Sequence, residues 1–170
     1  ILKEAKTKKE MKKFIMFPFE LYKNDKTWVP PLIFDEWNTF NPKKNPSFEF
    51  CEAAFFLALK ENKVVGRIAA IINHKANEAW NEKRTRFGWI AFIDDPEVSK
   101  ALLDTAEKWG AEKGMQGIHG PLGFTDLDPE GMQVEGFENN ATITSAHNYP
   151  YFPVHMEQHG FRKSVDWVQY

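Results

Sequence analysis

Two apolar segments joined by one clearly marked helix constrain this fold more than any other feature of the sequence. The helix begins at residues 95–97 (Asp-Pro-Glu), which supply an N-cap acceptor, a proline at the first helical position and an acid in the first turn. Its apolar stripe predicts a helix over 96–113. The flanking segments 86–93 and 117–122 have strand composition. Since a helical crossover joins parallel strands, these two strands are expected to be parallel neighbours.

Residues 53–73 carry a β-hairpin pattern. The stretch 54–59 is almost wholly apolar, Glu61 and Asn62 supply a polar turn, and 64–72 is rich in valine and isoleucine. This hairpin is expected at the centre of the sheet.

Four further segments complete the predicted order of elements. An amphipathic helix is expected over 8–22, with its lysines forming a solvated face. The prolines and aromatic residues of 28–50 favour an ordered connection rather than disorder. A short helix over 153–159 and a final strand over 161–170 follow.

Composition limits the class of protein. The chain has 170 residues, a formal net charge of -2 and one cysteine, Cys51, which we expect to be a buried thiol. No apolar run approaches the roughly 20 residues that span a bilayer. We therefore expect a single domain over 1–170 in the cytoplasm, with neither a membrane nor a nucleic acid as partner.

The order of elements resembles that of the GNAT acyltransferase superfamily, which binds acyl-CoA between two splayed parallel strands. The hairpin, the helix from residue 98 to Gly114 and the sequence His-Gly-Phe at 159–161 carry this resemblance. Four sequences look more closely like a group of bacterial GNAT-like proteins that carry a further C-terminal domain: WVPPL at 28–32, NPKKNP at 41–46, GRIAAIIN at 66–73 and GPLGFTDLDPEGMQVEGF at 120–137.

The resemblance implies an α/β (α+β) fold with a mixed, mainly antiparallel central sheet, one parallel and splayed strand pair, and helices on both faces. It also implies that 1–170 is the N-terminal part of a longer protein. The implied reaction is acyl transfer from acetyl-CoA or another acyl-CoA to a small-molecule amine.

The superfamily holds the CoA pyrophosphate between its fourth strand and the next helix, where small residues let backbone N–H groups approach the anion. Here Asp94, Glu97 and Ser99 occupy those positions. A carboxylate about 5 Å from a phosphate charge opposes binding by roughly 3 kcal/mol, against the roughly 0.3 to 2 kcal/mol that a helix N-terminus supplies. The loop is therefore degenerate. The residues expected to contact acyl-CoA are Phe92, Ile93, Val98, Ser99 and Lys100.

Catalytic candidates come from the segment after the long helix. His119 or Asp126 is the expected base, although a lone histidine in a strand is more often a packed core residue. Met156 occupies the position where the superfamily often has a tyrosine that acts as the general acid. Tyr149 or Tyr151 is therefore expected to protonate the thiolate instead.

Two other readings stay open. The degenerate loop favours a catalytically inactive GNAT-fold module that binds a ligand or a partner domain. A weaker alternative is a metal-dependent hydrolase, because His155 and His159 stand four residues apart on a predicted helix near an acidic loop. The site residues proposed for the acyltransferase include no metal ligand.

Overall fold

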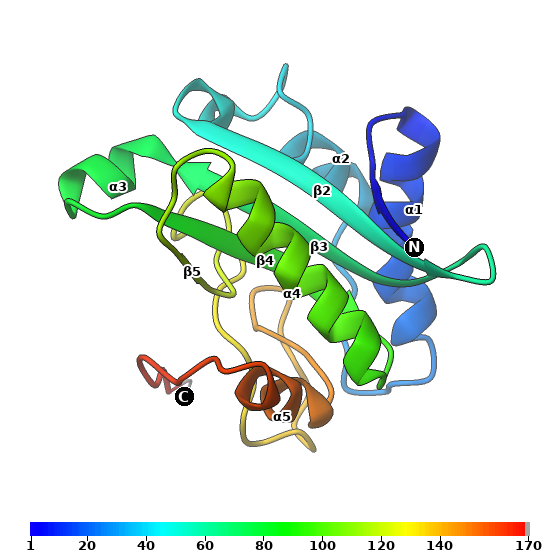
Figure 1. The fold of residues 1–170 in the computed structure, drawn as a ribbon. Helices are drawn as coiled ribbons and strands as arrows, with labels where there is room; N and C mark the ends of the chain where they lie inside the picture. The colour runs from blue at the N-terminus through cyan, green and yellow to red at the C-terminus, as the bar shows by residue number, and fades with distance from the viewer. Residues whose placement is uncertain (169–170) are drawn as a thin grey trace.

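The predicted hairpin forms the centre of a five-stranded sheet in the computed structural model, which describes residues 1–168 (Figure 1). In sheet order the strands are β1 (Leu2–Glu4), β2 (Cys51–Lys60), β3 (Lys63–Asn73), β4 (Arg84–Phe92) and β5 (Gly117–His119). Neighbouring strands are antiparallel except for β4 and β5, which are parallel as predicted.

Helices cover both faces of this sheet. They are α1 (Lys8–Leu21), α2 (Ile33–Thr39), α3 (His74–Ala79), α4 (Pro96–Ala111) and α5 (Tyr151–Gln158), with a 3-10 helix η1 at Pro46–Glu49. In Figure 1, α4 crosses one face of the strands, and α1 lies on the other face. Two hydrophobic clusters result, one under α4 and α5 and one under α1 and the connection that follows it. This arrangement confirms the predicted fold class.

Local sequence explains where the main elements begin and turn. Thr7 and Glu10 form a capping box at the start of α1, in which each side chain accepts the other residue's backbone N–H. The two residues between β2 and β3, Glu61 and Asn62, both have positive φ angles, 51° and 64°, as a tight two-residue hairpin turn requires. The carboxylate of Asp95 accepts the backbone N–H of Glu97 and caps α4.

Two predicted strands differ from the structure. β5 ends at His119 rather than 122, because Gly120 has a φ of 154° and Pro121 has no N–H to continue the ladder. The strand predicted over 161–170 is absent from 161–168, while 169–170 lie outside the described residues. A strand needs a hydrogen-bonded neighbour, and within the described residues β5 pairs only with β4.

The structure also contains short elements that the sequence did not predict: β1, α2, η1 and α3. Cys51 is buried as expected, and burial raises the pKa of its thiol to about 11. Within residues 1–168 there is no helix with the length and apolarity needed to cross a membrane.

A substitution at Gly110 tests how closely α4 packs on β4. A methyl group at Gly110 would lie 1.7 Å from the Oγ1 atom of Thr85, a side chain with almost no exposed surface. Alanine normally stabilises a helix over glycine by about 1 kcal/mol, but overpacking costs about 1 to 3 kcal/mol. We expect Gly110→Ala to lower the free energy of unfolding, measured by urea denaturation. Gly117→Ala, which has open space around it, should leave that energy nearly unchanged.

Candidate active site

The parallel ladder between β4 and β5 is short, because β5 has only three residues. Three residue pairs are in register, from Arg84 with Gly117 to Arg86 with His119, and the N–H of Leu122 then reaches the carbonyl of Phe87 at 2.8 Å. Beyond that bond, the described part of the chain gives the carboxyl half of β4 no strand neighbour on this side. The parallel ladder therefore stops where β5 ends.

A β-bulge lies in the same part of β4. Arg67 pairs with Ala91 and Ala69 pairs with Gly88, so β4 contains one residue more than β3 over this stretch. Trp89 lies within the bulge and has a φ of 45°, which is rare for a bulky residue. Bulges bend a strand and re-aim its backbone groups, and they are frequent next to active sites. The bulge thus changes which backbone groups of β4 face the open side.

Helix α5 packs over the end of β4. The hydroxyl of Tyr151 donates a hydrogen bond to the carbonyl of Phe92 at 2.6 Å. The ring of Phe152 stacks on that of Phe92 with centroids 4.2 Å apart. Burial, with smaller contributions from Asp94 and Tyr149, raises the pKa of Tyr151 well above the normal range, so this phenol stays protonated at neutral pH.

The N-terminus of α4 does not fit a pyrophosphate. The N–H groups of Glu97, Val98 and Ser99 all bond to Asp95, the first to its carboxylate and the others to its carbonyl. Position 96 is proline and has no N–H. The nearby cation, Lys60, is paired with the Asp95 carboxylate at 3.1 Å. Both the donors and the positive charge that an anion would need are therefore already engaged.

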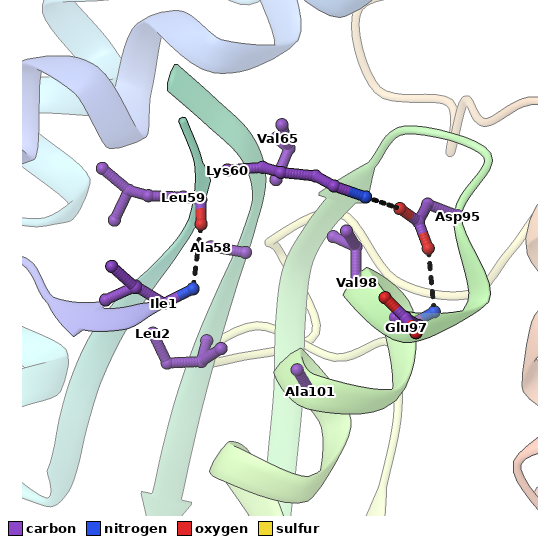
Figure 2. A pocket seen from close by; sticks show the side chains of 10 residues that line it. All are labelled: Ile1, Leu2, Ala58, Leu59, Lys60, Val65, Asp95, Glu97, Val98 and Ala101. Atoms are coloured by element: carbon purple, nitrogen blue, oxygen red, sulfur yellow. Dashed lines mark hydrogen bonds and ion pairs between the residues drawn. The ribbon is translucent and has the colours of Figure 1, made fainter. Parts of the chain in front are cut away.

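A hollow of about 210 Å³ lies beside this N-terminus (Figure 2). The hollow lies on the side of the β2–β3 hairpin. Most of the residues that line it are aliphatic, among them Val65 and Val98. Asp95 and Glu97 border it, and the carboxylate of Asp95 is shared between Lys60 and the N-terminus of α4. The two carboxylates at its border oppose an anion, and the aliphatic side chains offer contacts to an apolar group.

A chain of hydrogen bonds joins α4 to α5. Asp94 Oδ1 lies 2.9 Å from His155 Nε2, and His155 Nδ1 lies 2.8 Å from the Oγ atom of Ser99. The Nε2 atom of His159 is also 2.8 Å from that oxygen. Because the hydroxyl carries one proton, at least one imidazole must donate to it. The pKa of His159 is lowered by burial and then by His155 and Lys100.

This network gives the two predicted histidines a structural partner. His155 and His159 converge on Ser99, which is completely buried. Within residues 1–168, no group of three or more His, Cys, Asp or Glu side chains is arranged to hold a metal ion.

The other predicted contacts to acyl-CoA lie along the same junction. Phe92 is buried under α5, and Ile93 packs against the same hydrophobic cluster. Val98 borders the hollow of Figure 2. Lys100 is exposed and paired with Asp104 at 2.6 Å.

The predicted bases lie away from Tyr151. His119 is level with Arg86 and lines a second hollow of about 200 Å³ together with Trp80. Phe92 is six residues further along β4 than Arg86, a distance of roughly 20 Å at the usual strand rise. Burial, followed by the charges of Arg86 and Arg84, lowers the pKa of His119. Asp126 is exposed in the loop after β5.

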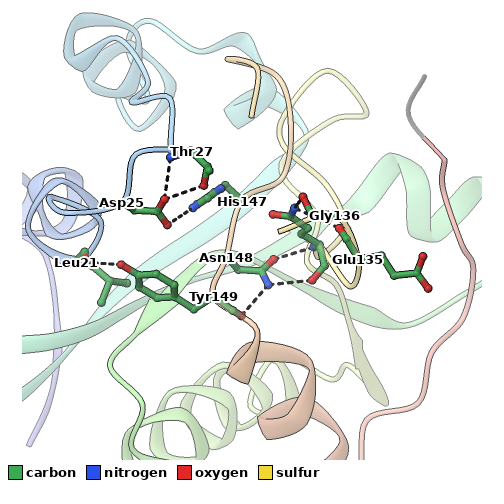
Figure 3. Close-up of polar contacts among 9 residues, drawn as sticks. Leu21, Asp25, Thr27, Glu135, Gly136, His147, Asn148 and Tyr149 are labelled. Carbon is green, nitrogen blue, oxygen red and sulfur yellow. Dashed lines mark hydrogen bonds and ion pairs between the residues drawn. The ribbon is translucent and has the colours of Figure 1, made fainter. Parts of the chain in front are cut away.

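The structure adds a pair of residues that sequence reasoning missed. His147 Nε2 lies 3.0 Å from Asp25 Oδ2, and Asp25 also accepts hydrogen bonds from the backbone and hydroxyl of Thr27 (Figure 3). The pair is separated by 122 residues in sequence, so no local spacing could have revealed it. The hydroxyl of Tyr149, close by in Figure 3, donates to the carbonyl of Leu21 at 3.2 Å.

Aromatic rings connect this pair to the end of β4. His147 packs edge-on against Tyr22 at 5.0 Å, and Tyr22 lies 5.1 Å from Tyr149. Tyr149 in turn lies 5.7 Å from Tyr151, the residue that bonds to Phe92. The two predicted tyrosines and the newly found histidine thus belong to one cluster.

Comparison with solved structures defines the class of fold. The chain matches, over its full length, an aminoglycoside acetyltransferase (meta-AAC0020) from an uncultured soil metagenomic sample, with a TM-score of 0.57, 12% identity and 94% of that chain covered. It matches a protein of Clostridium acetobutylicum, described as a predicted acetyltransferase and solved with acetyl-CoA, at a TM-score of 0.56 and 11% identity, again over its full length and 94% of that chain. The protein therefore has the GNAT fold, as the sequence resemblance predicted.

Two curated proteins are similar in sequence. Protein YghO of Escherichia coli is 36% identical over 166 residues, which cover 95% of this chain and 42% of YghO. The bacterial ceramide synthase of Caulobacter vibrioides is 32% identical over 167 residues, which cover 98% of this chain and 44% of that protein. The chain thus spans less than half the length of these relatives. No protein-family model matches it.

Ser99 tests the network between α4 and α5. Replacing Ser99 by alanine leaves two imidazoles without their shared partner, one of them on the buried His155. We expect the free energy of unfolding to fall by about 1 to 3 kcal/mol. Thr105→Ala is the matched control, because this hydroxyl in the same helix bonds only to the carbonyl of Ala101 in its own turn. Equal losses in the two variants would contradict the assigned role.

Asp25 tests the pair with His147. Burial alone would raise the pKa of Asp25, but hydrogen bonds from Thr27 and His147 outweigh it and lower the pKa below its ordinary 3.8. A lowered pKa stabilises the fold above the unfolded value, and this stabilisation is lost as pH falls through the folded pKa. Asp25→Asn should therefore cost most stability at neutral pH and progressively less below pH 3.8. Chemical denaturation across this range measures the difference, and a constant difference would refute the assignment.

Proposed function

We propose that this chain is an N-acyltransferase domain that moves an acyl group from an acyl thioester, such as acetyl-CoA or another acyl-CoA, to an amine. The observation that carries the proposal is the carboxyl half of β4. There a bulged strand, with no strand neighbour on its β5 side, ends beneath the hydroxyl of Tyr151. Backbone N–H groups on such an edge can polarise a thioester carbonyl.

The reaction has one bond made and one broken. The amine nitrogen attacks the thioester carbon, a C–N bond forms, and the C–S bond breaks to release a thiolate. A base takes one proton from the amine, and an acid gives one to the thiolate. The products are an amide and a free thiol.

Tyr151 is the proposed acid, because its hydroxyl lies on the carbonyl of Phe92, at the end of the β4 edge where the thioester would bind. His147 is the proposed base, because Asp25 orients its ring. The contacting rings of Tyr22 and Tyr149 connect it to Tyr151. His119 and Asp126 are the alternative bases.

The proposed acceptor is a long-chain amine. Ceramide is the amide of a fatty acid and a long-chain amino alcohol, and the relative from Caulobacter vibrioides is named a ceramide synthase. The apolar hollow of Figure 2 is compatible with an aliphatic chain. The acyl donor would bind without its diphosphate at the N-terminus of α4, where Asp95 occupies the donors.

One observation favours the second candidate, a GNAT-fold module that binds a ligand or partner without catalysis. The same capped and acidic N-terminus of α4 removes the main anchor that other superfamily members are expected to use for CoA. The metal-dependent hydrolase has no comparable support.

Tyr151→Phe separates the candidates. We expect kcat for acyl transfer from a long-chain acyl-CoA to a long-chain amino alcohol to fall by about 100-fold with little change in KM, since general acid catalysis contributes about 10² to 10⁴. Product amide is measured by mass spectrometry. Tyr149→Phe, whose hydroxyl bonds to Leu21 instead, should retain activity.

A negative result is equally informative. Donor binding at 100 times Kd stabilises a fold by about 2.7 kcal/mol, which a thermal shift detects. Neither turnover nor a shift with acyl-CoA would reject the enzyme in favour of the binding module.

A further inference from the structure

Six consecutive apolar residues, 29–34 (Val-Pro-Pro-Leu-Ile-Phe), form an exposed patch, here called the 29–34 patch. Its large side chains remain open to solvent, with exposed fractions of 60% for Leu32, 41% for Ile33 and 73% for Phe34. A contiguous exposed apolar run of this kind usually marks an interaction surface.

The patch is held in place at both ends. Trp28, just before it, packs against Phe19 and Tyr22 of the α1 region with ring centroids 5.3 and 5.2 Å away. Phe40, just after α2, packs against Phe14 at 5.3 Å. The exposed side chains therefore sit on an anchored segment.

A buried charge pair fixes the orientation of α2. Glu36 faces inward, 3.8 Å from the guanidinium of Arg67 on β3, and that guanidinium also donates to the carbonyl of Phe14 at 2.9 Å. With Glu36 turned toward the sheet, Phe34, two residues earlier in the helix, is directed outward. Leu32 is the N-cap of α2, and its side chain is also exposed.

The layer that carries the patch is basic. Residues 1–44 contain ten lysines against six acids, whereas residues 45–170 contain twelve lysines and arginines against eighteen acids. On α1, an exposed arc consists of Lys8, Lys9, Lys12 and Lys13. No ion pair engages these four lysines within the described residues. Helices α1 and α2 contact each other over the same hydrophobic cluster, so the arc and the patch share one face of the sheet.

We propose that this face binds an anionic lipid surface, with the 29–34 patch entering the apolar region and the lysine arc of α1 contacting the headgroups. Apolar side chains flanked by lysines are the combination that peripheral membrane binding uses. Charge complementarity favours an anionic bilayer over a second copy of this chain, because two basic faces repel each other. The proposal rests on the proposed function for its purpose, which is to reach a long-chain amine dissolved in a membrane. It goes beyond the sequence-based expectation of no membrane partner.

The test is co-sedimentation with vesicles of phosphatidylcholine alone or with phosphatidylglycerol added. We expect binding to the mixed vesicles only, weakened at high salt because screening shortens the reach of surface charges. A double variant Leu32→Ser with Phe34→Ser should weaken binding at least tenfold. Trp80→Ser is its control, since this exposed tryptophan lies after α3, away from α1 and α2.

The lysines need their own pair of variants. Lys12→Gln with Lys13→Gln should also weaken binding at least tenfold, whereas Lys63→Gln with Lys108→Gln removes the same charge from the hairpin and α4 and should have little effect. Equal effects of the two double variants would mean that binding depends on the net charge of the protein and not on the lysines of α1, and would overturn the proposed surface. Circular dichroism verifies that each variant is folded.

Two further outcomes would overturn the proposal. One is the absence of binding to any vesicle. The other is a dimer, seen by size-exclusion chromatography, that the Leu32 and Phe34 substitutions abolish while vesicle binding is unchanged, since the patch would then join two copies. No acyl donor or amine is present in these assays, so failure of the proposed function and failure of this surface are distinguishable.

Discussion

The site depends on the point at which the ladder between β4 and β5 stops. Parallel strands normally share evenly spaced hydrogen bonds, and each bond not made leaves a polar backbone group that needs another partner. Here Gly120 and Pro121 end β5 early, while β4 continues through its bulge to Phe92. Tyr151 satisfies the last carbonyl. The side chain of Tyr151 thus takes the place of a neighbouring strand at this carbonyl, and it brings the proposed acid to the backbone edge.

The second constraint is electrostatic. A helix N-terminus buried without partners is costly, and Asp95 meets that need at α4 with its own carboxylate. The buried hydroxyl of Ser99 bonds instead to His155 and His159, and these hydrogen bonds connect α5 to α4. The same residues that make the junction stable also remove it as an anion site. The acyl donor of the proposed reaction would therefore have to be held by other contacts.

Charge and apolar surface are divided between the two faces of the sheet. The α1 layer has an excess of lysines, and the segment from Gly114 to Phe161, which includes β5 and α5, has neither lysine nor arginine. Such a division of charge can orient a protein relative to a charged surface. If the proposed acceptor is a lipid amine, the basic face and the site at β4 serve one purpose.

Local pattern was enough for the hairpin, α1, α4 and the parallel relation of β4 to β5, because these elements follow from alternation, helical spacing and end signals within short windows. The resemblance to the GNAT superfamily anticipated the fold, and the acids at Asp94 and Glu97 were visible in the sequence itself. The predicted strand at 161–170 was wrong over 161–168, because a pattern of alternation does not supply a neighbouring strand. What only the tertiary structure decided is which distant groups meet: Asp25 with His147, Ser99 with two histidines, and Tyr151 with β4. These contacts join residues 56 to 122 positions apart, and chain packing rather than local spacing sets such distances.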